Sequence, residues 1–167
     1  MRVLTKANSD PVNFQIASAG AGAISKLPKL VPIPLIKAVA GSHGETGDIV
    51  PTLRNIPVES IIAAPKEWCP NPSATTCVRV KGNSMNPLIY DGYLLVVDTS
   101  QTDRSKLNGK IVIAWNKEKG LTVSRLQSYD HIEVLRSDNR EYESVVLNVR
   151  NKWKILGKVL WWIGKAT

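Results

Sequence analysis

A short stretch in the middle of the chain has the residue types of a nucleophilic site. Residues 82–87 read Gly-Asn-Ser-Met-Asn-Pro, and an Asp-Gly pair follows at Asp91 and Gly92. A serine on a tight turn after a strand is exposed, and its hydroxyl becomes a nucleophile once a neighbouring base accepts its proton. Glycine, asparagine, serine and proline also form turns in proteins of every kind. Taken by itself, this pattern favours a turn residue at Ser84 over a catalytic one.

The segments that would position this turn are predicted to be short β-strands. Each is an alternating or short apolar run bounded by turn residues such as those at 91–92 and 108–109. The predicted strands are residues 77–81, 93–98, 110–115, 121–126, 131–135 and 154–161. No helical pattern of about 10–15 residues separates them, which argues against a parallel α/β fold. We therefore expect a mainly β fold with a mostly antiparallel, partly barrel-like sheet.

The first part of the chain has a different character. Residues 1–30 include a stretch of small Ala, Gly and Ser residues and are predicted to be a flexible tail or linker, which leaves residues 31–167 as the folded domain. Residues 31–48 combine proline, glycine and short apolar patches, so we expect an extended arm laid over that domain. Residues 49–76 are rich in proline and are expected to be irregular, with room for a short helical turn around residues 58–64.

Composition excludes several classes of protein. At 43% hydrophobic residues the chain is too apolar to be disordered. Its net charge of +8 suits nucleic acid or acidic partners, but a Lys-rich solvated surface explains it more simply. No segment reaches the roughly 18 apolar residues of a membrane span, and the N-terminus lacks the apolar core of a signal peptide. We therefore expect a cytoplasmic protein that does not contact a membrane.

The cysteines and histidines do not indicate a metal or cofactor site. Two cysteines, Cys69 and Cys77, are too few for a disulfide framework, and we expect both to be reduced and structural. His43 and His131 show no ligand spacing with them. We therefore predict neither a metal nor a cofactor.

The wider pattern around Ser84 resembles the serine peptidase domain (S24) of the LexA, phage-repressor and UmuD family. That family has a strand, then Gly-x-Ser-Met-x-Pro, then Asp-Gly and an apolar strand, and residues 78–98 follow this order. Four more motifs of the family are matched in order by residues 108–114, 121–126, 136–142 and 155–159. The match spans about residues 32 to 162, and it implies a LexA/signal-peptidase-like β fold.

The resemblance also implies a Ser/Lys type of peptidase site. Ser84 matches the nucleophile of the family, and Gly82, Met85 and Pro87 match the cleft motif around it. The base of the family is a lysine on a neighbouring strand, kept neutral because burial disfavours the ammonium form. At the matching position this chain has Ser124, and a hydroxyl cannot replace an amine as base. We therefore expect a peptidase that is inactive or trapped uncut.

The target of such a site is commonly an Ala-Gly bond in the N-terminal arm of the same chain. Residues 33–41 resemble that arm and end on Ala40 and Gly41, which we take as the cleavage site. Two further Ala-Gly pairs, between residues 19 and 22, lie farther from Ser84. A glycine turn that is never cleaved is the alternative.

The resemblance implies a self-cleaving repressor domain of an SOS-type response, a homodimer whose cleavage the RecA filament stimulates. DNA binding would need a helix-turn-helix domain, and no such pattern is present in this chain. Two alternatives remain. The missing lysine favours a non-catalytic dimerisation or sensor module. A signal peptidase shares the Ser-Met motif, but the lack of a membrane anchor in this sequence argues against it.

Overall fold

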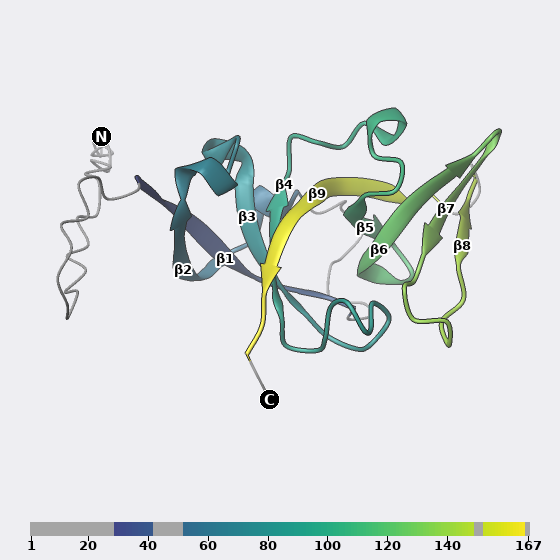
Figure 1. Cartoon of the computed structure of the whole chain (residues 1–167), viewed down its shortest axis with the longest axis horizontal. Coiled ribbons are helices and arrows are strands. Elements are labelled where there is room, and N and C mark those ends of the chain that lie inside the picture. The colour runs from purple at the N-terminus through teal and green to yellow at the C-terminus, as the bar shows by residue number, and fades with distance from the viewer. Residues whose placement is uncertain (1–28, 42–51, 149–151, 166–167) are drawn as a thin grey trace, which may run out of the picture.

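The strands of this protein form one mixed sheet. A computed structural model describes residues 29–41, 52–148 and 152–165. Nine strands pair there in the order β2-β1-β3-β4-β9-β5-β6-β7-β8 (Figure 1). Every neighbouring pair is antiparallel except β1 and β3, which are parallel. The prediction of a mainly β, mostly antiparallel fold is confirmed, although the sheet does not close into a barrel: β2 and β8 remain as its two edges.

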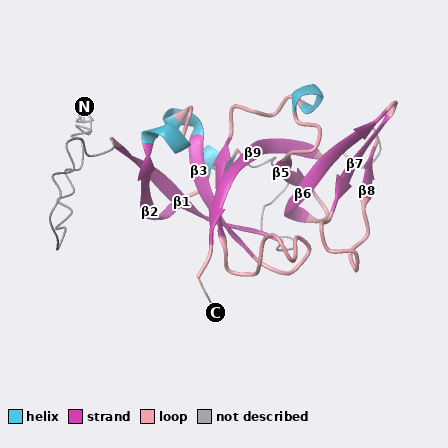
Figure 2. Ribbon diagram, viewed as in Figure 1, coloured by secondary structure: helices cyan, strands magenta, loops and turns pink. Residues whose placement is uncertain are grey.

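The strands and helices are short. The strands are β1 Leu30–Ala40, β2 Val58–Pro65, β3 Thr75–Val80, β4 Leu94–Asp98, β5 Ile111–Asn116, β6 Gly120–Tyr129, β7 Ile132–Arg136, β8 Val145–Leu147 and β9 Lys154–Ile163. The described residues also form four single-turn 3-10 helices, drawn in cyan in Figure 2: η1 Leu53–Asn55, η2 Lys66–Trp68, η3 Pro72–Ala74 and η4 Arg104–Lys106. All six strands predicted from the sequence are present, with ends shifted by three residues at most.

Two segments before β3 differ from expectation. Residues 58–64, predicted as a helical turn, belong to the edge strand β2, where Ile62 pairs with Ile33 of β1. Both isoleucines pack in one apolar cluster with Ala64, and this tertiary contact determines the strand. β1 is extended, as expected, but it is an integral strand between β2 and β3 rather than an arm laid over the sheet.

The prolines of β1 are compatible with this interior position. Pro32 and Pro34 precede Leu35, where the pairing of β1 with β3 begins. Their missing N–H groups therefore remove no hydrogen bond from that ladder. The Pro34 carbonyl oxygen accepts a hydrogen bond from Thr76 Oγ1 at 3.1 Å, so β3 still contacts this part of β1 through a side chain.

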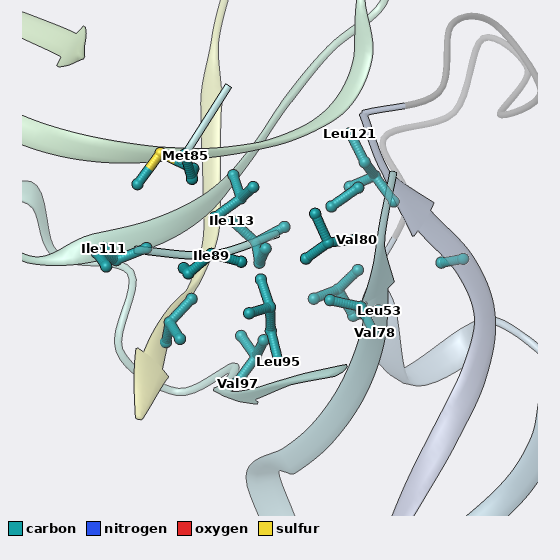
Figure 3. Close-up of a cluster of buried hydrophobic side chains, with 14 of the residues drawn as sticks. Leu53, Val78, Val80, Met85, Ile89, Leu95, Val97, Ile111, Ile113 and Leu121 are labelled. Carbon is teal, nitrogen blue, oxygen red and sulfur yellow. The ribbon is translucent and has the colours of Figure 1, made fainter. Parts of the chain in front are cut away.

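The main core is a cluster of buried apolar side chains from β1, β3, β4, β5, β6 and β9 and from the turn after β3 (Figure 3). Val78 and Val80 contribute to this cluster from β3, while Cys77, which precedes Val78, packs in a different cluster, as alternation along a strand requires. Met85 and Ile89, from the turn after β3, insert into the same core and are 1% and 0% exposed. The turn that carries Ser84 is therefore anchored by apolar burial, by Val80 before the serine and by Met85 and Ile89 after it.

The remaining structural expectations concern membranes, metals and thiols. Among the described residues, no helix has the length and apolar character needed to cross a membrane. The same residues contain no group of three metal-ligating side chains.

Cys69 and Cys77 are buried free thiols, and burial raises the pKa of the Cys77 thiol to about 12. That thiol is therefore a poor nucleophile at neutral pH.

Candidate functional site

A cleft of about 350 Å³ opens between the turn after β3 and the start of β6. Gly41, Ser84 and Ser124, three of the predicted site residues, all line it. They come from three segments, the end of β1, the turn after β3 and the middle of β6. The fold therefore brings Gly41 of the predicted cleavage site to the same cleft as the predicted nucleophile and base position. Ala40, the other residue of that pair, is 0% exposed and packs in the main core beside the cleft lining.

Ser84 is half-buried on a turn that is held at several points. Gly82 opens the turn with φ of +95°, and its N–H donates to Asp91 Oδ1 at 2.6 Å. Asp91 is thus a structural residue of the turn. The Asn86–Pro87 peptide bond is cis. Of the three residues assigned to the cleft motif, Gly82 lines the cleft, whereas Met85 lies in the core and Pro87 is exposed outside the lining.

Ser124 lies on β6 opposite Val112 of β5, and it is 5% exposed. The next residue, Arg125, does not line the cleft. Its Nε and Nη2 donate to Asp138 Oδ1 and Oδ2 at 2.9 and 2.6 Å. The hydrogen bond with Arg125 lowers the pKa of Asp138, and the same bond raises the pKa of Arg125. Arg125 is thus committed to an ion pair and is no substitute for a base at position 124.

The Ala40–Gly41 bond is held by main-chain hydrogen bonds on both sides. The Lys81 N–H donates to the Ala40 carbonyl oxygen at 2.9 Å, and the Gly41 N–H donates to the Leu121 carbonyl oxygen at 2.7 Å. Gly41 has φ of +111°, and a Cβ at this position would overlap the Lys81 carbonyl oxygen. Both the backbone conformation and the space therefore require glycine.

Replacing Gly41 with alanine is expected to lower the free energy of unfolding by about 1–3 kcal/mol, because it adds a clash with Lys81 to the strain of a positive φ. Gly109 provides a matched control: its φ is +74°, but a Cβ there meets nothing within 4 Å. Gly109→Ala is expected to cost only the backbone strain, about 1–2 kcal/mol or less. Urea unfolding measures both variants. Equal losses would show that Lys81 does not restrict position 41.

The ion pair beside the site predicts a pH-dependent stability. Asp138 has a lowered folded pKa, so its contribution is present above the unfolded carboxyl pKa and is lost as pH falls below about 4. Asp138→Asn is expected to cost about 1.5–3 kcal/mol at pH 7 and much less near pH 3. The exposed Glu59–Arg79 pair, 3.9 Å apart, is the control, and Glu59→Gln should change little. Denaturant unfolding at both pH values checks this, and an Asp138→Asn loss independent of pH would contradict it.

Comparison with known proteins identifies the family. The family whose sequence model matches this chain is Peptidase S24-like, and the match covers residues 34–160. The chain belongs to this family. LexA repressors are among its similar relatives: that of Haemophilus ducreyi is 34% identical over 84 residues, which are 50% of this chain and 38% of that protein. That of Glaesserella parasuis serovar 5 is 32% identical over 103 residues, 58% of this chain and 47% of the repressor. The matches thus cover less than half of each repressor.

Several sequence predictions fall outside the described part of this S24-like chain. They are the tail before residue 29, the Ala-Gly pairs between residues 19 and 22, His43, and the arm beyond Gly41. The assignment of residues 1–30 to a tail and 31–167 to a domain therefore stays a prediction, except that Leu30 already begins β1.

Sequence reasoning missed how Asn139 contacts the turn that carries Ser84. Asn139 donates its Nδ2–H to the Asn83 carbonyl oxygen at 3.0 Å, and its backbone N–H donates to the Ser84 carbonyl oxygen at 3.0 Å. The sequence signal that could have indicated this contact was the position of Asn139 in the family motif at residues 136–142.

Two lysines, Lys81 and Lys119, line the cleft, but both are exposed and lack the buried setting of a lysine base.

Proposed function

We propose that this chain is a self-cleaving repressor domain that stays uncut because Ser124 occupies the position of the general base. One observation carries the proposal: Gly41, Ser84 and Ser124 line the same cleft. The hydrogen bonds from Lys81 and to Leu121 seat the Ala40–Gly41 bond beside it. A bond held next to a serine in the same chain benefits from a high effective concentration of the nucleophile.

In the proposed reaction, Ser84 Oγ attacks the Ala40 carbonyl carbon while a base accepts the hydroxyl proton. The C–N bond between Ala40 and Gly41 then breaks, the Gly41 nitrogen takes the proton and leaves as an amine, and the acyl group stays on Ser84. Water hydrolyses this ester in a second step and frees the serine. A general base contributes typically about 10²–10⁴ in rate, so loss of the lysine is enough to leave the chain uncut.

The experiment that tests this function is the intact mass of a Ser124→Lys variant, incubated beside the unchanged chain. A cut between Ala40 and Gly41 in the variant alone supports a peptidase site silenced at one position. An uncut, folded variant contradicts it.

A second candidate is a non-catalytic dimerisation or sensor module of a transcriptional regulator. Ser124 favours it, because the described cleft contains no buried amine to activate Ser84. In this role the segment ending at Gly41 is a permanent part of the sheet rather than a substrate. A dimer in sedimentation experiments, together with no cleavage of the Ser124→Lys variant at any pH, would favour this candidate.

The wider setting proposed for the chain comes from its likeness to LexA repressors. It is a cytoplasmic homodimer that acts in transcriptional repression of an SOS-type response. A helix-turn-helix domain outside these residues supplies the DNA contacts, and the RecA filament stimulates cleavage. RecA filaments on single-stranded DNA, added to the Ser124→Lys variant at neutral pH, test the last partner; an unchanged cleavage rate would exclude it.

A further inference from the structure

Asn139 contacts the turn that carries Ser84 with both its side chain and its backbone. The side-chain Nδ2–H donates to the Asn83 carbonyl oxygen, and the backbone N–H donates to the Ser84 carbonyl oxygen, each at 3.0 Å. The remaining polar groups of Asn139 stabilise its own loop: Oδ1 accepts from the Glu141 N–H at 3.0 Å, and the carbonyl oxygen accepts from the Tyr142 N–H at 3.2 Å. One residue therefore joins two loops that are more than fifty positions apart in the sequence.

The loop of Asn139 is in turn fixed to strand β6. Asp138, which precedes it, is 12% exposed and forms the two-bond ion pair with Arg125. A second cation, Arg136, lies 3.6 Å from Asp138 Oδ1. Arg125 also donates from Nη1 to the Gly109 carbonyl oxygen at 2.9 Å, so its guanidinium has partners on two sides. A bidentate pair restricts orientation as well as distance.

Arg125 directly follows Ser124, which lines the cleft. A continuous series of contacts therefore runs from position 124 through Arg125, Asp138 and Asn139 to the Ser84 turn. Asp91 also holds this turn, because its Oδ1 accepts a hydrogen bond from the Gly82 N–H. These hydrogen bonds hold the turn in addition to the core contact made by Met85.

We propose that Asn139 is a positioning residue that sets where Ser84 stands relative to the side chain at position 124. This inference rests on the proposed peptidase function and extends it. Asn139 touches neither reacting atom; it acts through the main chain of Asn83 and Ser84. A general base must lie within hydrogen-bond reach of the hydroxyl, so a small displacement of the turn lowers the rate of proton transfer.

Two variants in the Ser124→Lys chain separate this role from simple support of the loop. Asn139→Asp keeps an acceptor for Glu141 but loses the donor to Asn83, and it places a carboxylate beside a carbonyl oxygen. Asn139→Ala loses both side-chain bonds without adding charge. If the bond to Asn83 positions Ser84, both variants cut themselves about tenfold more slowly. If Asn139 acts only through its bond to Glu141 within its own loop, Asn139→Asp keeps the cleavage rate of the parent.

The pH profile and the thermal midpoint distinguish positioning from unfolding. In Asn139→Ala the plateau rate should fall while the pH midpoint, which the introduced lysine sets, stays unchanged. The thermal unfolding midpoint should remain well above the assay temperature. The inference is overturned if Asn139→Asp cuts at the parent rate, or if both variants slow down only in proportion to the folded fraction.

A second measurement tests the inference if Ser124→Lys fails to cut, an outcome that contradicts the proposed function itself. Hydrogen exchange in the otherwise unchanged chain compares Asn139→Asp with its parent. The amide hydrogens of residues 82–86, 88 and 89 should exchange at least tenfold faster in the variant, while those of β4 and β9 stay protected. Equal exchange in the turn would show that Asn139 does not position it.

Discussion

The Ser124→Lys variant is expected to cut itself between Ala40 and Gly41 when incubated at alkaline pH. Ser124 is 5% exposed, so a lysine there is largely removed from water, and desolvation disfavours its charged form. The neutral amine then accepts the proton of Ser84, which lines the same cleft. The gain over the unchanged chain should be about 10²–10⁴ in rate. Intact mass against time measures it.

Two control variants test the roles of the nucleophile Ser84 and of the lysine at position 124. Ser84→Ala in the Ser124→Lys chain should abolish the cut, because the attacking oxygen is gone. Thr122→Lys places a lysine at a neighbouring cleft position on the same strand and should leave the chain uncut. Cleavage by the Thr122 variant would show that any amine in the cleft suffices, and the specific role of position 124 would be wrong.

The Met85→Ala substitution is expected to lower the free energy of unfolding by about 2–5 kcal/mol. Met85 is 1% exposed and packs among the buried side chains of the main core (Figure 3), so truncation leaves a cavity as well as losing apolar contact. The same change frees the turn beside Ser84. In the Ser124→Lys chain it should therefore slow cleavage by more than the folded fraction explains.

Leu88→Ala is the matched control for Met85→Ala. Leu88 belongs to the same turn but is 39% exposed, so its truncation should cost about 1 kcal/mol or less. Urea unfolding compares the two variants. Similar losses would mean that Met85 does not anchor the turn, and the account of how Ser84 is held would need revision.

The strands around the site were predictable because their signals are local. Alternation and turn pairs at residues 91–92 and 108–109 depend on neighbours in the chain, and they located six of the nine strands. β2 was missed because its solvent-facing side chains give no clear alternation, and Ile62 is ordered by pairing with Ile33. β8, only three residues long, gives no local signal and is held by pairing with β7 and by packing of Val145 and Leu147 against a buried cluster.

The sequence by itself determined the family motif, a serine on a Gly-x-Ser-Met-x-Pro turn with an Ala-Gly pair upstream, and it predicted a peptidase site in which Ser124 stands at the position of the lysine base. Residue types carry this information without a fold. Only the tertiary structure decided that Gly41 reaches the cleft, because this depends on β1 pairing in parallel with β3. It also decided that Asn139 holds the Ser84 turn, since that contact joins loops far apart in the chain and no local pattern encodes it.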